Sequence, residues 1–420
     1  MSSIRFLWRD RTYSLLLTTG FTAALTSCIL IGVYIRFQLS FDQFHKNVNL
    51  IAQVYQEYDS GIIVSTGMKM GPLLVENFPE YTDFTRIHYK GGLLRLQDSP
   101  SQPAYQEEGV AFVDTNFFSF FSFPLIAGHV KDVLQRPNSI VLSRQKAVSY
   151  FGSIEASLGK TVMLDDKMLC LVTGVCEDIP SNSSIQFSIA ISISSLNEVY
   201  QSTSFESWWW PPMYTYLQLS APNMFTSVSQ ARLNQFATTF REEGITIFPR
   251  IDRFVDIHVN GLAGGEGIHS TLWILGAIGA IILLIAIINY VNLVTARASI
   301  RALEVGVRKS LGATRLDLFV QFMTEGWIVS LLSVALASVL AESLLPVSER
   351  LYHINMDAPW DNWQYWTLLL GVSILLAFVA GFYPVLILTS FSPVKAIKQQ
   401  VAGSAKGSGF RKVLVGSQFV

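Results

Sequence analysis

The chain has 420 residues, 50% of them hydrophobic, and its 30 basic residues nearly balance 31 acidic ones, for a formal net charge of −1. This length allows two or three domains, and the near-neutral charge gives no indication of nucleic-acid binding. Three cysteines do not form a disulfide framework, because Cys170 and Cys176 would lie about 20 Å apart on one extended strand.

The apolar residues concentrate in four stretches, each long enough to cross a bilayer core of roughly 30 Å, which takes about 20 residues. They predict transmembrane helices at residues 13–36, 271–296, 318–343 and 365–389. The third has the weakest indication, because Glu325 and Glu342 bracket its uncharged part. The first is not a cleaved signal peptide, since it exceeds a typical h-region and no small-residue cleavage site follows.

Basic residues predict which segments face the cytoplasm, because Lys and Arg are retained on that side. The N-terminal segment carries Arg5, Arg9 and Arg11, so we expect it inside. Alternation then places segments 1–12, 297–317 and 390–412 inside and segments 37–270 and 344–364 outside. Four tryptophans fall at the predicted outer boundary, as an aromatic belt requires: Trp273, Trp360, Trp363 and Trp366.

The segment 37–270 switches to short strands and helices, which predicts a large α+β domain, either undivided or of two subdomains with the middle one inserted. The expected strands are Ile51–Tyr55, Ser139–Leu142, Thr161–Leu164, Leu169–Cys176, Phe187–Ile193, Tyr214–Leu219 and Phe254–Val259. The expected helices are Gly71–Phe78, Arg144–Phe151 and Asn223–Phe240.

The basic loop, residues 297–317, lies between two long uncharged segments. Helix formers run from Ile300 to Leu311, and Gly312 stands where a C′ glycine would end that helix. Glu304 and Arg308 are i,i+4 neighbours in the favourable order. Thr314 with Asp317 resembles a capping box that starts the next helix. A loop that only sets membrane topology is an alternative of equal weight.

Small residues recur at four-residue spacing in three spans, which allows helices to approach closely. They are Gly20, Ala24 and Gly32 in the first, Gly276 and Ala280 in the second, and Ser333 and Ala337 in the third. The alternative is that they are ordinary small residues of membrane helices. Glu325, close to a span interior, is a candidate functional residue, although snorkelling or pairing with an arginine accounts for it more simply.

The sequence contains no catalytic or metal-binding constellation. Gly159-Lys160-Thr161 imitates the end of a phosphate-binding loop, but Ile154 occupies the position of its first glycine. We therefore expect no enzyme activity, cofactor or metal. The aromatic run Trp208, Trp209 and Trp210 is the best surface candidate for an amphipathic ligand or partner, with core packing as the alternative.

Several motifs in co-linear order resemble one family. The stretch Glu304-Val-Gly-Val-Arg-Lys-Ser-Leu-Gly-Ala313 is similar to the cytoplasmic signature of FtsX-like ABC transporter permeases. Four segments resemble the opening of a MacB-like periplasmic core domain: Leu39-Ser-Phe-Asp-Gln-Phe-His-Lys46, directly after the first span, and then Pro137–Ser143, Tyr150-Phe-Gly152 and Val172–Pro180. Tyr383-Pro384 and Phe391–Ile397 match the exit from the fourth span.

The resemblance implies a type VII ABC permease subunit of the bacterial inner membrane, with four spans in a one-plus-three arrangement. A separate cytosolic ATPase would push on the basic loop, and the spans would relay the movement outward, a mechanism called mechanotransmission. It further implies that Glu304, Arg308 and Lys309 belong to the ATPase contact, that Val305 and Leu311 fill its groove, and that Gly306 and Gly312 permit close approach.

The implied function is export of a hydrophobic or amphipathic compound, such as a drug or antimicrobial peptide. The alternatives are a non-transporting relay, lipoprotein extraction, or an anchored binding protein without a motor. The resemblance is greatest to double-length permeases, so residues 413–420 are expected to begin a second repeat. Expected partners are the ATPase, membrane lipid, a second copy or repeat, and a periplasmic adaptor with an outer-membrane channel.

Overall fold

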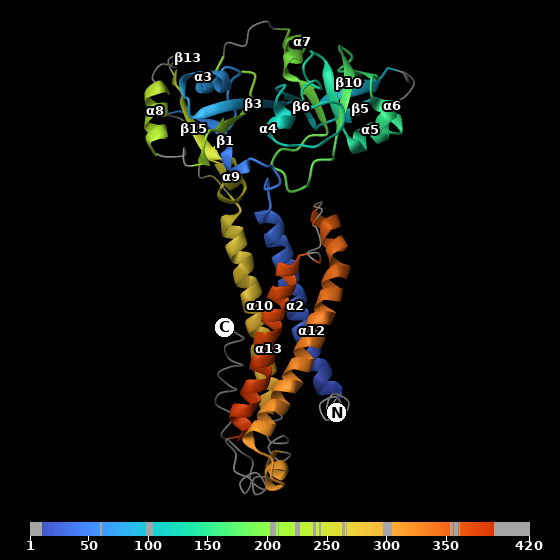
Figure 1. Cartoon of the computed structure of the whole chain (residues 1–420), viewed down its shortest axis with the longest axis vertical. Coiled ribbons are helices and arrows are strands. Elements are labelled where there is room, and N and C mark those ends of the chain that lie inside the picture. Colours follow the sequence, from blue (N-terminus) through green and yellow to red (C-terminus); the bar gives the residue numbers. More distant parts are fainter. Residues whose placement is uncertain are drawn as a thin grey trace. The chain divides into compact units, whose positions relative to one another are not determined.

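The computed structural model describes residues 11–58, 61–97, 104–201, 207–208, 210–222, 227–237, 241–242, 245–262, 265, 267–296, 305–352, 356, 360 and 362–389. The chain divides into two compact units (Figure 1). One, here called the α+β domain, is Gln38–His269; the other, the helical unit, combines Met1–Phe37 with Ser270–Val420. The predicted fold class is confirmed: an apolar helix precedes a large α+β domain, and further apolar helices follow it.

A 13-stranded sheet runs through the described part of the α+β domain. Its strands are β1 (Ile51–Tyr58), β2 (Gly61–Ile63), β3 (Tyr81–Tyr89), β4 (Gly92–Leu96), β5 (Tyr105–Glu107), β6 (Val110–Val113), β7 (Leu125–Ala127), β8 (Ser139–Ser143), β9 (Thr161–Leu164), β10 (Met168–Cys176), β11 (Ile189–Ser192), β12 (Tyr214–Leu219) and β15 (Phe248–Arg253). They lie in the order β15-β1-β12-β3-β6-β11-β8-β10-β9-β4-β5, with β2 on β1 and β7 on β10. The pairs β6–β11 and β8–β10 are parallel, and the other pairs are antiparallel. A separate small hairpin joins β13 (Arg241–Glu242) to β14 (Ile245–Thr246).

Short helices cover this sheet. They are α3 (Met70–Asn77), α4 (Phe117–Phe120), α5 (Arg144–Phe151), α6 (Ile154–Ser157), α7 (Leu196–Tyr200), α8 (Ser227–Ala237) and α9 (Phe254–Asn260), with 3₁₀ turns η1 (Val48–Leu50) and η2 (Ile193–Ser195). Local chemistry fixes their ends, as α5 illustrates: the Ser143 hydroxyl accepts from the Lys146 amide, and Gly152 ends the helix at φ 83°. Burial of apolar side chains between helices and sheet supplies the stability of the domain.

Most elements predicted for this domain are confirmed, including the β9–β10 hairpin and helices α3, α5 and α8. The prediction for Phe254–Val259 is wrong, because this stretch forms helix α9 and not a strand. Its apolar residues alternate as in a strand, but Phe254, Val255 and Ile257 all pack on the same core cluster. Gly261, at φ 78°, then ends the helix.

The helical unit contains α2 (Arg11–Leu39), α10 (His269–Ala296), α12 (Arg315–Tyr352) and α13 (Trp363–Thr389) (Figure 1). Among the described residues, three of these helices are long and apolar enough to cross a membrane, over Ser14–Leu39, His269–Ala296 and Arg315–Arg350. Within α13, the described apolar stretch Trp363–Phe378 is shorter. Helix α12 continues through Pro346 to Tyr352, although the span predicted from the sequence ends at 343.

Polar contacts and close approaches hold these helices together. Between α12 and α13, the Ser330 hydroxyl donates to the Ser373 carbonyl at 2.9 Å. Between α2 and α10, the Cys28 thiol donates to the Gly279 carbonyl at 3.4 Å. Phe21 of α2 also stacks on Tyr290 of α10, with ring centroids 5.4 Å apart. Such contacts between helices are the usual cohesive elements in a bilayer, where apolar burial gives little driving force.

His45 is an unusual core residue of the α+β domain. It is 2% exposed, and neither ring nitrogen has a hydrogen-bond partner of ordinary geometry among the described residues. The rings of Phe44, Phe121 and Phe123 surround it, with centroids 4.1 to 5.4 Å away. Burial lowers the pKa of His45 to about 4, and an interaction with the Phe121 backbone offsets only part of that shift. The folded domain therefore favours the neutral imidazole.

We expect the His45→Phe variant to be less sensitive to acid than the wild-type chain. An unfolded histidine binds its proton below about pH 6.5, so wild-type stability falls between there and pH 4, by about 3 kcal/mol in full. In urea unfolding at pH 5, the variant should keep about 2 kcal/mol more of its pH 7 stability than the wild type. Burial raises the pKa of Asp42, which acts in the opposite direction but equally in both proteins. Parallel losses in the two chains would contradict this prediction.

Candidate functional site

The described part of the basic loop begins with a short helix, whose end follows a recognised motif. Residues 305–310 are helical, and Gly312 adopts φ 96°, a left-handed conformation that favours glycine. The Ala313 amide donates to the Arg308 carbonyl at 3.0 Å, and the Gly312 amide donates to the Lys309 carbonyl at 3.1 Å. These two bonds form a Schellman motif with Gly312 at C′, as expected from the sequence.

The next helix, α12, starts with the predicted capping box. The Asp317 amide donates to the Thr314 hydroxyl oxygen at 3.2 Å, and the Thr314 amide donates to the Asp317 carboxylate at 2.8 Å. Each side chain therefore satisfies a backbone donor that the helix leaves unpaired. The chain thus turns between two helices with a defined geometry at each end.

A chain of polar contacts connects the basic loop to the interior of α12. The Arg308 guanidinium donates to the Gln321 side-chain oxygen, and the Gln321 amide group donates to the Glu325 carboxylate at 3.0 Å. These contacts hold the short loop helix against α12, with a charged group at each end of the series, Arg308 and Glu325. Gln321 was not among the predicted residues, although its i,i+4 spacing to Glu325 was a usable signal.

The face that the basic loop exposes differs in part from the expected one. Leu311 is 83% exposed, and Val307 and Leu316 are also exposed, so these three offer apolar surface. Val305, expected to fill a partner's groove, is 5% exposed and belongs to the buried side of the short helix. Gly306 is buried too, while Lys309 is half-buried. Glu304 lies outside the described residues.

The predicted packing residues fall into two groups. Ala24, Ser333 and Ala337 are buried in the helical unit, and the Ser333 hydroxyl donates to the Thr18 carbonyl of α2 at 3.4 Å. Added side-chain atoms at Gly20, Gly32 and Gly276 would meet nothing within 4 Å, and Ala280 is exposed. Gly381 was not predicted, yet it lies close to α12: a Cβ there would lie 2.8 Å from the Met323 Cα atom of that helix.

The tryptophan run divides in the same way. Trp208 is half-buried against a core cluster that includes Met70 and Leu74, with the Lys69 ammonium 5.9 Å from its ring centroid. Trp210 is 52% exposed and meets Tyr200 edge-on at 5.4 Å. Trp209 lies outside the described residues. Of the two tryptophans of this run that the structure describes, only Trp210 therefore presents a largely open ring.

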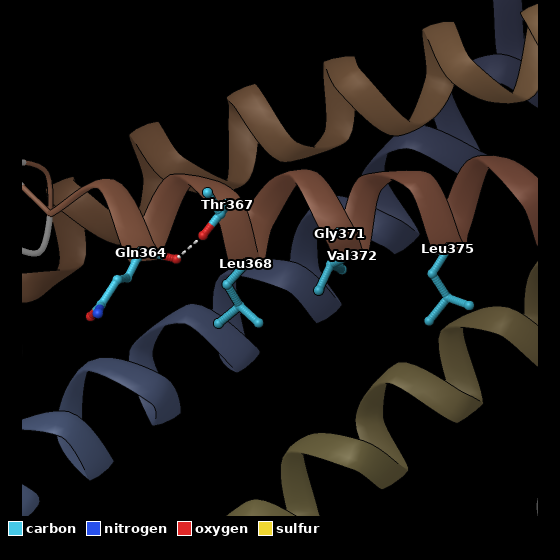
Figure 2. A pocket seen from close by; sticks show the side chains of 6 residues that line it. All are labelled: Gln364, Thr367, Leu368, Gly371, Val372 and Leu375. Atoms are coloured by element: carbon cyan, nitrogen blue, oxygen red, sulfur yellow. Dashed lines mark hydrogen bonds between the residues drawn. The ribbon is translucent and has the colours of Figure 1, made fainter.

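A groove of about 490 Å³ follows one face of α13. Its lining residues are Gln364, Thr367, Leu368, Gly371, Val372 and Leu375. Figure 2 shows Leu368 and Leu375 pointing to the same side of the helix, with Gly371 between them. The Thr367 hydroxyl donates to the Gln364 carbonyl at 2.8 Å, so its polarity is satisfied within the helix. The lining carries no charged group.

Among the residues that the structure describes, no group of three His, Cys, Asp or Glu side chains could hold a metal ion. The described part of the basic loop has a defined turn with exposed apolar side chains at Val307, Leu311 and Leu316.

Comparison with known families assigns most of the chain. The profile of the MacB-like periplasmic core domain matches residues 14–232, which is more than half of the 420-residue chain. The profile of the FtsX-like permease C-terminal region matches residues 276–393. The second match includes the basic loop, α12 and α13.

Two curated relatives match over shorter stretches. A segment of 62 residues is 37% identical to the macrolide export ATP-binding/permease protein MacB of Marinobacter nauticus, covering 15% of this chain and 10% of that protein. A segment of 154 residues is 24% identical to an uncharacterized ABC transporter permease, YknZ, of Bacillus subtilis, covering 36% of this chain and 37% of that protein. The matched segments thus span well under two thirds of the length of either relative.

Solved structures of similar domains resemble this chain more loosely. A domain of a permease protein from Porphyromonas gingivalis has 19% identity and a TM-score of 0.43, covering 50% of this chain and 92% of that one. The periplasmic region of MacB from Actinobacillus actinomycetemcomitans has 14% identity and a TM-score of 0.36, covering 50% and 90%. At these TM-scores the structures add nothing to the family assignment.

Proposed function

This chain belongs to the family of FtsX-like permeases with a MacB-like periplasmic core domain, and from that premise we propose that it couples ATP hydrolysis by a separate cytosolic ATPase to movement of its α+β domain. The resemblance of its motifs to that family is thereby confirmed, and ABC permease is its class. The chain is a non-catalytic subunit, and the ATPase supplies the chemical energy. The transmission is mechanical, through the helices.

The observation that carries this proposal is the construction of the basic loop. A loop that only sets membrane topology requires positive charges and no particular shape. This loop has in addition a Schellman end at Gly312, a capping box at Thr314 and the polar chain from Arg308 to Glu325. A stiff loop transmits a push, whereas a flexible one absorbs it. The geometry therefore supports the role of a handle for a motor.

The same loop sets the proposed orientation in the bacterial inner membrane. Arg308, Lys309 and Arg315 place it in the cytoplasm, where ATP and the ATPase are available. The N-terminus lies on that side as well, and the α+β domain lies in the periplasm. The exposed apolar faces of α10 and α13 contact membrane lipid.

Assembly into a pair accounts for the small residues that have open surroundings. A Cβ added at Gly20, Gly32 or Gly276 would meet nothing within 4 Å among the described residues, and Ala280 is exposed. Small residues of this kind allow the backbones of two membrane helices to approach closely. The partner is a second copy of this chain or a second repeat, and a periplasmic adaptor with an outer-membrane channel could complete an export path.

The proposed substrate class is a hydrophobic or amphipathic compound, which the α+β domain handles on the outer side of the membrane. Helix α10 carries no charged residue, so a polar conduit through it has no support in the sequence. The relative from Marinobacter nauticus is named for macrolide export, which agrees with this class. A relay without transport is the alternative function.

Co-purification with the cognate ABC ATPase tests the proposal. The chain and ATPase would be reconstituted in lipid nanodiscs, and ATP turnover would be compared with that of the ATPase alone. Stable association with altered turnover supports a motor-coupled permease. Absence of association would reject it. Substrate-stimulated turnover and transport into vesicles would then distinguish export from a relay.

We expect the Leu311→Asp variant to weaken ATPase binding by at least about tenfold, because an exposed apolar anchor in the contact is worth about 2 kcal/mol. The substitution should leave the fold intact, since Leu311 is 83% exposed. Leu169→Asp, at another exposed leucine on β10, is the matched control and should bind normally. Titration of the ATPase onto nanodiscs measures both. Equal affinity of the two variants would contradict the prediction.

A further inference from the structure

The α+β domain has two covalent connections to the helical unit, and residues of both lie close together. The chain enters the domain at Gln38, near the end of α2, and it leaves after α9, before α10 begins at His269. The entering residues from Gln38 onward and helix α9 both belong to the α+β domain itself.

His258 of α9 contacts the entering connection directly. Its Nε2 atom donates to the Gln38 side-chain oxygen at 2.6 Å, across 220 residues of sequence. Its ring also lies parallel to that of Phe41, with centroids 3.4 Å apart and planes 4° from parallel. One side chain of the leaving connection thus makes both a directional polar contact and a stacking contact with the entering one.

Asp42 fixes the entering connection to the rest of the domain. It adopts φ 59°, which costs free energy for a residue other than glycine and persists only where the surroundings hold it. Its amide donates to the Asn182 carbonyl at 2.9 Å, and its carboxylate accepts from the Ser184 amide at 2.8 Å. The Asn182 side chain in turn donates to the Ser40 hydroxyl at 3.0 Å.

His45 completes the attachment from the same turn. Its ring lies 6.1 Å from that of Phe254, at the start of α9, as well as among Phe121 and Phe123. The beginning and the later part of α9 therefore both touch the entering segment, through Phe254 and His258 respectively. This arrangement gives a structural role to the sequence motif at residues 39–46.

We propose that Gln38, Phe41, Asp42, His45 and His258 form a clasp that makes the two connections of the α+β domain move as one body, with His258 as the positioning residue. This inference rests on the proposed function. Beyond α9, Gly261, Gly265 and Gly267 lie in a turn in which the Gly265 amide donates to the Leu262 carbonyl at 3.0 Å and the Gly267 amide donates to the Gly265 carbonyl at 2.9 Å. The clasp transfers a displacement of the entering connection to α9 and to the rest of the domain without passing through that turn.

The first test uses hydrogen exchange of the full chain alone in nanodiscs, so it does not depend on any ATPase. His258→Ala should raise the exchange of the amides of residues 38–46 by about tenfold, because the contact across the clasp is lost. His258→Phe keeps a ring against Phe41 and should give a smaller rise. Unchanged exchange in His258→Ala would overturn the clasp.

The second test separates positioning from mere stability, with the cognate ATPase present. In the wild type, ATP should change the exchange of the α+β domain relative to ADP. His258→Ala should lose most of this change while ATP turnover continues. The control is His88→Ala, a buried histidine of the same domain that donates to the Pro212 carbonyl at 2.7 Å and contacts Tyr200, away from both connections.

The outcomes assign failure to one proposal or the other. If His88→Ala loses the ATP-dependent change as fully as His258→Ala, the clasp has no special role and the inference is wrong. If the wild type shows no ATP-dependent change and binds no ATPase, the proposed function fails, whereas the first test still decides whether the clasp exists.

Discussion

The Arg308→Glu variant is expected to bind the ATPase about a hundredfold more weakly than the wild-type chain, and to leave ATP turnover at the level of the isolated ATPase. Reversing a charge in a docked contact costs about 3 kcal/mol, which corresponds to that factor. The new carboxylate would also approach the Gln321–Glu325 pair, where it meets a like charge. Titration of the ATPase onto nanodiscs and turnover measurements give both quantities.

Two further variants show whether the effect is specific to Arg308 and how that residue acts. Arg350→Glu makes the same charge change at an exposed position near the other end of α12 and should bind normally. Gln321→Leu keeps the Arg308 charge but removes its contact with α12. Weak binding by Gln321→Leu would assign Arg308 to holding the loop in place, whereas normal binding would assign it to the partner. Tight binding by Arg308→Glu itself would reject its role in the contact.

Local rules were sufficient for the ends of the basic loop. Gly312 as a C′ residue and Thr314 with Asp317 as a capping box depend only on neighbours in sequence, and the structure has both. Which side of the short helix is buried depends on tertiary packing instead. Val305 and Val307 are equally apolar, but Val305 is buried and Val307 is exposed. The sequence could not distinguish these two.

The same limit applies to the α+β domain. Single strands such as β12 follow from composition and alternation, and the structure has β12 at its predicted bounds. The pairing of β1 with β12 and β15 joins segments that are far apart in sequence, which no local pattern reports. Alternation also misled at Phe254–Val259, where the core contacts of α9 decide the conformation. Gly381 was missed although Ser373 and Ala377 precede it at four-residue spacing; the spacing does not tell which helix lies against that face.

Gly381→Val is expected to destabilise the helical unit by about 3 kcal/mol, because overpacking of a tight contact strains both helices. A Cβ atom at this position would lie 2.6 Å from the Met323 sulfur, 2.8 Å from the Met323 Cα atom and 3.1 Å from the Phe322 carbonyl oxygen. Two of these three atoms are backbone of α12, which cannot move aside as a flexible side chain could. Thermal unfolding of the chain in nanodiscs measures the loss.

Gly371→Val on the same helix is the matched control, since it carries the same cost in helix propensity. A Cβ at Gly371 meets nothing within 4 Å, because this glycine opens onto the groove between Leu368 and Leu375 (Figure 2). The valine should therefore be accepted there with little change in unfolding temperature. A large difference between the two variants isolates the α12–α13 contact from the intrinsic effect of valine.

Because α12 begins at the capped end of the basic loop, loosening that contact should also reduce ATPase stimulation, and only in Gly381→Val. Equal stability of both variants would mean that the close approach at Gly381 does not hold the two helices together.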